Sequence, residues 1–164
     1  LKFTYDNMKV SNKMKPEAEW VKEKVEEQNK KEAGKGDAFA KAWVENRANV
    51  YEPKFEELFN KEAGENLQGD RTKSSAKYTL IVHTTRTEQG YNIGISKAPA
   101  SIDFEFIIVE TANPSVIKSK GVLLNVPGSS FAGADFDVAS RLKECYAKSG
   151  KTMGKKLGKA CKSK

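Results

Sequence analysis

The stretch IDFEFIIVETANPSVIKSKGVLLNV (residues 102–126) decides the fold class of this 164-residue chain. Its two halves are rich in β-branched and aromatic residues, and the Ala-Asn-Pro-Ser segment between them is a turn signal. We therefore expect an antiparallel hairpin. If the turn is centred on residues 113–114, Phe106 falls opposite Gly121, a pairing in which an aromatic ring covers a strand glycine.

A third strand-like run, YTLIVHTTRT (residues 78–87), precedes the hairpin. Alternation in the three runs gives one apolar face for helices and one half-polar face. His83, the only histidine of the chain, falls on the half-polar face. We expect a partner to contact that face, through Ile81, His83, Thr85, Asp103, Glu105, Ile107, Val109, Lys118 and Lys120.

Helical sequence precedes this sheet, over residues 16–64. Two segments rich in good helix formers each end at a glycine, Gly34 and Gly64, which favours helix termination. Asp37 is a candidate N-cap for the second segment. Pro53 must interrupt or kink that segment, because proline lacks the amide hydrogen and crowds the preceding turn.

A final helix is expected from residue 136, with Asp135 as its candidate cap. Gly150, Gly154 and Gly158 recur at every fourth residue of this segment. They form either a strip that lets another backbone come close or a flexible, poorly helical end. In water the second interpretation is favoured, and we expect fraying after about residue 157.

The net charge of +7 is concentrated at the carboxyl-terminal end. Residues 148–164 hold seven lysines and no acidic residue, whereas the first 147 residues carry 22 basic and 22 acidic side chains. Nucleic-acid-binding faces normally spread basic residues over the fold and interleave aromatics. This segment could still meet an anionic membrane surface, an acidic polymer or nucleic acid, or remain a solvated end. The candidate polyanion-binding residues are Lys148, Lys151, Lys155, Lys156 and Lys159.

No motif in the sequence fixes a catalytic chemistry. SGKT (residues 149–152) lacks the first glycine of a P-loop, because Cys145 occupies that position. One histidine and two distant cysteines do not have metal-ligand spacing, so we expect neither a metal nor a cofactor. Asp103 and Glu105 could act as paired carboxylates near His83, although surface charge pairs are far commoner. We expect a protein that is not an enzyme, and keep a hydrolase using His83 as a third hypothesis.

The two cysteines and the first residue bear on the compartment. On one continuous helix Cys145 and Cys161 would lie about 24 Å apart, beyond disulfide reach, so free thiols are expected. The sequence starts at Leu1 and not at Met, which fits either removal of a signal peptide or simple trimming. We expect a secreted or periplasmic location, with the cytoplasm as the alternative.

Three stretches carry a resemblance to known proteins: AKYTLIVHTTRTEQGYNIGISKAPASIDFEFIIVETANP (76–114), NVPG (125–128) and DFDVASRLKECYAKSGKTMGKKL (135–157). They resemble a group of small uncharacterised secreted proteins of gut bacteria. The element order is also distantly similar to the accessory α/β domain of envelope lipoproteins of the curli-secretion and penicillin-binding-protein activator types. The resemblance implies an envelope setting and a non-catalytic, protein-contacting role. The charged helical insert at residues 16–52 and the lysine-rich end depart from this pattern.

We predict one α+β domain over residues 1–147, followed by a basic extension over residues 148–164. The domain has two layers, an antiparallel sheet (residues 77–126) with helices on one face. The predicted function is binding or scaffolding in the bacterial envelope, through the exposed sheet face and toward a protein partner or a second copy. The alternative is polyanion or nucleic-acid binding through the lysines. No small-molecule substrate is identified.

Overall fold

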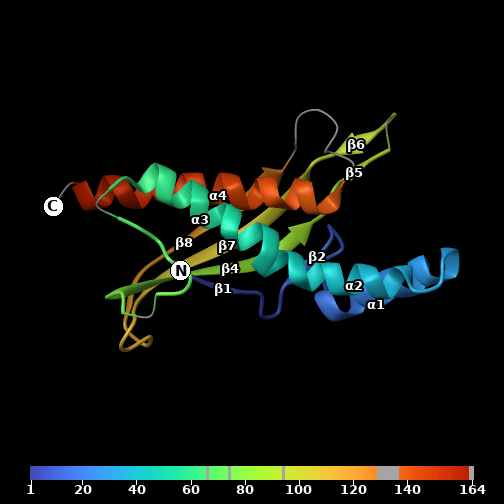
Figure 1. The fold of residues 1–164 in the computed structure, drawn as a ribbon, viewed down its shortest axis with the longest axis horizontal. Helices are drawn as coiled ribbons and strands as arrows, with labels where there is room; N and C mark the ends of the chain where they lie inside the picture. The colour runs from blue at the N-terminus through green and yellow to red at the C-terminus, as the bar shows by residue number, and fades with distance from the viewer. Residues whose placement is uncertain (66, 74, 94, 129–136, 163–164) are drawn as a thin grey trace.

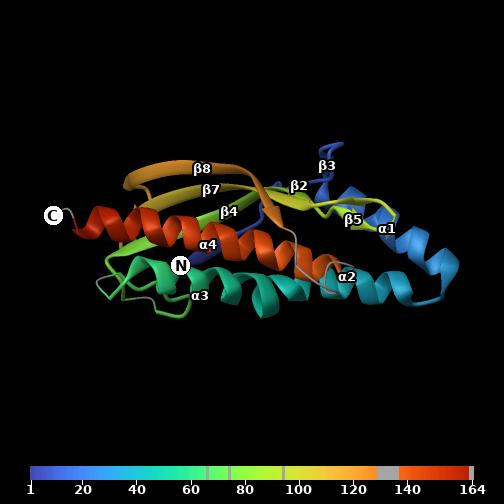
Figure 2. The ribbon, with the colours of Figure 1, turned by 90° about the horizontal axis from the view of Figure 1, so that it is seen from above.

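The computed structural model describes residues 1–65, 67–73, 75–93, 95–128 and 137–162. They form two layers, a six-stranded sheet and a set of helices that covers one face of it (Figures 1 and 2). The predicted α+β class with helices on one face of a sheet is therefore confirmed. The expected cap at Asp135 and helix start at residue 136 lie outside the described residues.

Three long antiparallel strands form the centre of the sheet. They are β4 (Tyr78–Glu88), β7 (Ala100–Glu110) and β8 (Ile117–Gly128), with β7 between the other two. Phe106 lies opposite Gly121, so the predicted hairpin register is confirmed over the body of the hairpin. Near the turn the register shifts by one residue and Val109 pairs with Ile117.

The amino-terminal segment extends the sheet on the other side of β4. It contributes β1 (Lys2–Thr4), β2 (Lys9–Val10) and β3 (Lys15–Pro16). β1 and β2 both pair parallel with β4, so the complete sheet is mixed and not purely antiparallel. A separate small hairpin, β5 (Tyr91–Asn92) with β6 (Lys97–Ala98), projects beyond the sheet (Figure 1).

The helical part before the sheet consists of α1 (Glu17–Lys31), α2 (Lys35–Asn46), the π-helical turn η1 (Arg47–Tyr51) and α3 (Glu52–Ala63). The predicted interruption at Pro53 takes the form of η1, because a π turn adjusts the helix just before the proline. The N-cap of α2 is Gly34, with φ of 82°, and not Asp37 as predicted.

The last helix, α4 (Val138–Lys162), is continuous and lies beside α3 under the sheet (Figures 1 and 2). The prediction of fraying after residue 157 is wrong, and the predicted boundary at residue 148 falls inside this helix. The reason is the glycine strip, which is packed and not flexible. A Cβ on any of these glycines would overlap a backbone carbonyl oxygen of α3: Gly150 that of Phe55, Gly154 that of Phe59, and Gly158 that of Ala63.

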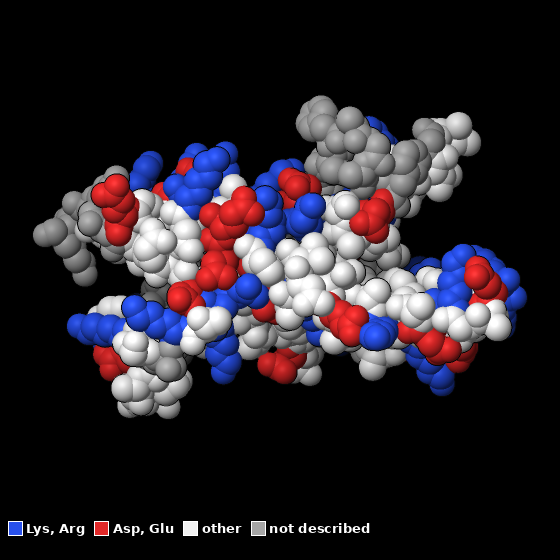
Figure 3. All heavy atoms as spheres, in the orientation of Figure 1, with Lys and Arg blue, Asp and Glu red and all other residues white. Residues whose placement is uncertain are grey.

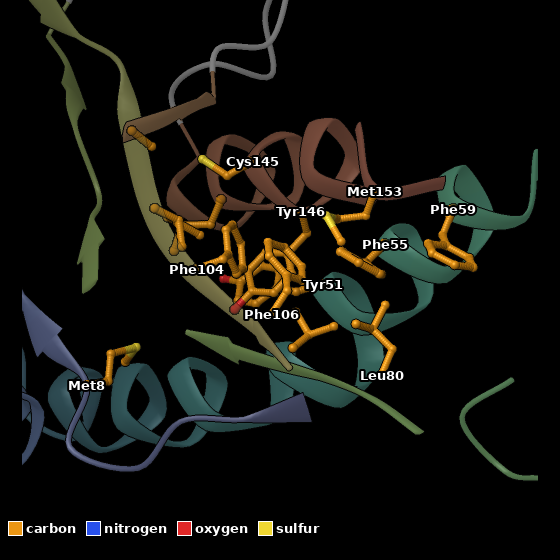
Figure 4. Close-up of a cluster of buried hydrophobic side chains, with 14 of the residues drawn as sticks. Met8, Tyr51, Phe55, Phe59, Leu80, Phe104, Phe106, Cys145, Tyr146 and Met153 are labelled. Atoms are coloured by element: carbon orange, nitrogen blue, oxygen red, sulfur yellow. The ribbon is translucent and has the colours of Figure 1, made fainter. Parts of the chain in front are cut away.

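Both helices step by four residues in the same direction along this contact, so α3 and α4 run parallel. Aromatic side chains fill the space between the helices and the sheet (Figure 4). The ring of Tyr146 stacks on that of Tyr51, with centroids 5.2 Å apart, and meets Phe104 edge-on at 5.1 Å. Its hydroxyl lies 2.8 Å from Thr84 Oγ1, so this buried polar group keeps a hydrogen bond.

The substitution Gly154→Ala distinguishes packing from flexibility by the sign of its effect. We expect the free energy of unfolding to fall by about 1–3 kcal/mol, because the added methyl group forces α3 and α4 apart. If the glycine were only a flexible position, alanine would instead stabilise the helix by about 1 kcal/mol. Urea unfolding measures the difference in the free energy of unfolding. The control makes the reverse exchange, Ala160→Gly, at an exposed position of α4.

Candidate functional site

The sheet face opposite the helices carries most of the residues predicted to contact a partner. None of the described helices covers this face (Figure 2). The strand register arranges its central side chains in two rows, which we call the open face: Thr4, His83, Glu105 and Val122 in one row, and Lys2, Ile81, Ile107 and Lys120 in the next. Sequence alternation predicted this placement of His83, Ile81 and Ile107 correctly.

His83 is half-buried within its row. Its Nδ1 atom lies 2.9 Å from Thr4 Oγ1 on β1, and Glu105 is its neighbour on β7. The hydroxyl and the imidazole belong to side chains of adjacent strands on the same face of the sheet. His83 lines neither of the two cavities, each of about 400 Å³, that are described below. Asp103, the other carboxylate predicted near His83, is engaged elsewhere.

Asp103 belongs to a polar network that crosses β4, β7 and β8. The Arg86 guanidinium donates to both carboxylate oxygens, from Nε at 2.7 Å and Nη2 at 3.1 Å. Arg86 Nη2 also donates to Asn125 Oδ1 at 2.7 Å, and the Asn125 backbone N–H donates to Asp103 at 2.6 Å. Desolvation acts to raise the pKa of Asp103, but the hydrogen bonds from Arg86 and Asn125 outweigh it and lower this pKa.

Two strand irregularities assemble this network. One, between Thr84 and Arg86, places Arg86 opposite Asp103 on the open side of the sheet. The other lies in the β7–β8 pairing between Ile102 and Phe104, next to Asn125 of β8. The φ of Asn125 is 52°, a value that asparagine tolerates. Strict alternation places Arg86 on the helix side, so sequence reasoning missed it. Thr85, at the first irregularity, is half-buried and donates to the Asp103 carbonyl at 3.2 Å.

Two more predicted contact residues are differently placed. Val109 is only 3% exposed, so its predicted accessibility is wrong. The register shift beside it brings Ile117 opposite, and Val109 lies between that residue and Thr79 of β4. Lys118 is exposed, but its ammonium group lies 2.6 Å from a Glu110 carboxylate oxygen, and this hydrogen bond raises the pKa of Lys118.

The most exposed part of this side of the sheet is strand β8. Val122 and Leu124 expose 62% and 64% of their surface, and Lys120 is exposed beside them. β8 is also an edge strand, because among the described residues only β7 pairs with it. The other edge of β8 therefore presents backbone N–H and C=O groups to which a further strand could bond.

The lysines predicted to bind polyanions lie on α4. Lys148, Lys151, Lys155 and Lys159 follow one stripe on the side away from the core, with spacings of three, four and four residues. Lys151 and Lys155 each lie 3.7 Å from a Glu62 carboxylate oxygen of α3, which offsets part of their charge. Lys156 lies apart from this stripe, toward β8. Figure 3 shows basic and acidic side chains interspersed over the helix side of the molecule.

Sequence reasoning did not find either of two cavities. One, of about 440 Å³, lies between the α1–α2 pair and the start of α4 and is lined by aromatic and polar groups that include Trp43, Tyr91 and Asp137. The other, of about 390 Å³, we call the apolar cavity. It is lined mainly by Leu1, Phe59, Leu67, Tyr78, Leu80, Ile108 and Leu157. These residues are scattered along the chain and form no sequence motif.

Both cysteines are free thiols, as predicted. Cys145 is buried beneath β8, and burial raises the pKa of its thiol to about 12. Cys161 is exposed near the end of α4, at the apolar cavity. The two thiols therefore differ strongly in reactivity, since the thiolate is the reactive form.

In the described part of the chain, no group of three or more His, Cys, Asp or Glu side chains is placed to hold a metal ion. The helices described do not include one that is long and apolar enough to cross a membrane. Comparisons with protein-family models, with curated proteins and with solved structures give no match to this chain. The candidate sites are the open face, the β8 edge, α4 and the cavities.

Replacing Asp103 by asparagine tests the polar network. We expect Asp103→Asn to lower the free energy of unfolding by about 1–3 kcal/mol at pH 7, because Arg86 loses its charged partner. The pKa of Asp103 is lowered in the folded state, so its stabilising effect is present above the ordinary pKa of 3.8 and is lost as the pH falls through the folded value. The difference between the two proteins should therefore shrink in acid. Asp6→Asn, at an exposed position, should show no comparable difference at either pH.

Proposed function

We propose that this protein is a non-catalytic binding protein that takes up an extended segment of a partner protein along the free edge of β8. The observation that supports this best is the combination of exposed Val122 and Leu124 with an edge of the same strand that no other described strand pairs with. Exposed apolar side chains in a group mark interaction surfaces more often than single ones do. A strand added at this edge would bond to the β8 backbone and continue the open face.

The side chains of β8 define the chemistry of the preferred segment. Lys120, Val122 and Leu124 are all exposed and alternate in the sequence of β8, and Leu124 lies at the irregularity beside Asn125. An added antiparallel strand would place alternate side chains beside them. We therefore propose a segment with two apolar residues and then a carboxylate residue at alternate positions, read from its amino end. A lysine on an edge strand discourages pairing with unrelated strands. A carboxylate in the added segment would pair with Lys120, so the acidic residue makes the binding selective.

The cellular setting is part of the proposal. The resemblance of residues 76–157 to small secreted proteins of gut bacteria supports a role in the bacterial envelope. We propose that the partner is another envelope protein, which presents such a segment from a loop or a chain end. Detection of the native protein in periplasmic or secreted fractions, and not in the cytoplasm, is the expected result of fractionating the source cells.

Binding of a short peptide tests the proposed segment. The probe is a blocked peptide with valine, valine and glutamate at alternate positions and threonine between them. We expect the wild-type chain to bind it, Val122→Lys to abolish binding, and Lys120→Glu to weaken it about threefold through loss of an exposed ion pair. Fluorescence anisotropy of the labelled peptide measures each dissociation constant.

A charge swap completes this test. A peptide with lysine in place of glutamate should bind Lys120→Glu more tightly than it binds the wild type. Lys22→Glu, at an exposed position of α1, makes the same charge change far along the chain and should alter neither affinity. Equal binding of a shuffled peptide, or equal effects of the two lysine substitutions, would contradict strand addition at β8.

A second candidate function rests on α4. Because this helix is continuous to Lys162, four of its lysines form one ordered stripe: Lys148, Lys151, Lys155 and Lys159. Such a stripe suits contact with an anionic polymer that runs along the helix.

Binding of a single-stranded oligonucleotide at several salt concentrations tests this second function. We expect the affinity to fall with salt, and Lys155→Gln with Lys159→Gln to reduce the slope by about 0.7 for each lysine removed. The control replaces Lys22 and Lys13, which are exposed outside α4. Salt-independent binding, or equal slopes for the wild type and the α4 double variant, would exclude this function.

A further inference from the structure

We propose that the apolar cavity binds the alkyl chain of a single-chain fatty carboxylate. This site is separate from the β8 edge and does not depend on the function proposed for it. Its volume of about 390 Å³ falls in the range of cavities that bind small ligands. The proposal rests on the chemistry of the floor, on a wall that is held in place, and on a cation at the rim.

The floor of the cavity is formed by hydrocarbon side chains from both layers of the fold. Phe59 comes from α3, Leu80 from β4, Ile108 from β7 and Leu157 from α4. Phe59 and Leu80 belong to the core, so the floor of the cavity is continuous with the core. A flexible alkyl chain matches this surface, because it brings no polar groups that would need partners.

The outer wall of the cavity is formed by residues 67–70, 73, 75 and 76, and hydrogen bonds join part of this segment to α3. The Asn60 side chain accepts from the Gly69 N–H at 2.6 Å and donates to the Gly69 carbonyl at 2.8 Å. The Arg71 Nε atom donates to Glu56 of α3 at 2.6 Å. These bonds join residues 69 and 71 to α3, and Leu67 lines the cavity.

The rim supplies the group that would meet a carboxylate. Lys73 lines the cavity and is exposed, and no ion pair with another described residue holds its ammonium group. The rim also contains Asp70, whose Oδ1 atom accepts hydrogen bonds from Thr72 and from the Lys73 backbone N–H. The Asp70 carboxylate is thus turned into its own loop. The Leu1 amino group also lies at this rim but donates to the Asp70 carbonyl at 2.7 Å, so Lys73 is the cation proposed to meet a ligand.

Cys161 provides a direct measurement of occupancy. It lines the cavity and is exposed, whereas Cys145 is buried and its thiol pKa is about 12. At pH 8 a disulfide reagent such as DTNB should therefore modify Cys161 alone. We expect saturated carboxylates from octanoate to tetradecanoate, held below their critical micelle concentrations, to slow this modification saturably. Affinity should rise about fourfold for each added methylene until the cavity is full.

Two substitutions with a matched control test the assignment. Ala76→Trp, at an exposed lining position, should fill the cavity and abolish protection while the thermal unfolding midpoint stays unchanged. Lys73→Glu should weaken the carboxylates and strengthen alkylammonium ions of the same chain length. Lys61→Glu makes the same charge change at an exposed position of α3 that does not line the cavity, and it should behave as the wild type.

Four outcomes would overturn the proposal. The first is the absence of saturable protection across the whole series. The second is protection that does not depend on chain length, and the third is full protection in a folded Ala76→Trp protein. Equal affinity for carboxylate and ammonium ligands in the wild type would remove the role of Lys73 and, with it, the assignment of a carboxylate. None of these results bears on peptide binding at β8, so the two proposals fail independently.

Discussion

The direct contact between the backbones of α3 and α4 is the constraint on which the rest of the structure depends. Three glycines of α4 allow it, each against a carbonyl of α3. The contact fixes the rotation of α4, so that Tyr146 enters the core and Lys151 and Lys155 stay outside. Both helices lie on one face of the sheet, and none of the helices in the described residues covers the other face (Figure 2).

The functional features follow from where this packing ends. Leu157, one residue before the last glycine of the strip, lines the apolar cavity together with Phe59 of α3. Within the described part of the chain, β8 pairs only with β7 and carries exposed apolar side chains. The Arg86–Asp103 pair lies at the irregularities of the three central strands, and the Asn125 N–H joins β8 to it. Binding surfaces on rigid elements lose less entropy when a ligand docks.

Sequence reasoning predicted what depends on local pattern and missed what depends on packing. Alternation and the Asn-Pro turn were enough for the three central strands, for the pairing of Phe106 with Gly121 and for the side of the sheet that His83 occupies. Alternation failed at Arg86 and Val109, because each lies at a one-residue irregularity of the strand pairing. The irregularity changes the face of Arg86 and the cross-strand neighbour of Val109, and the residue types in the sequence do not indicate it. A glycine in every fourth position is equally typical of a packed strip and of a weak helix end, and only the position of α3 distinguishes them. The cavity residues share no pattern at all.

The central functional claim is that the outer edge of β8 accepts a strand, and amide hydrogen exchange tests it most directly. In the free chain, alternate amides of β8 face β7 and should exchange slowly, whereas those on the open edge should exchange fast. Addition of the peptide with alternate valine, valine and glutamate should slow the edge amides around Lys120, Val122 and Leu124 and leave those of α1 and α2 unchanged. Slowing spread over the whole molecule, or no slowing in β8 at saturating peptide, would contradict the account.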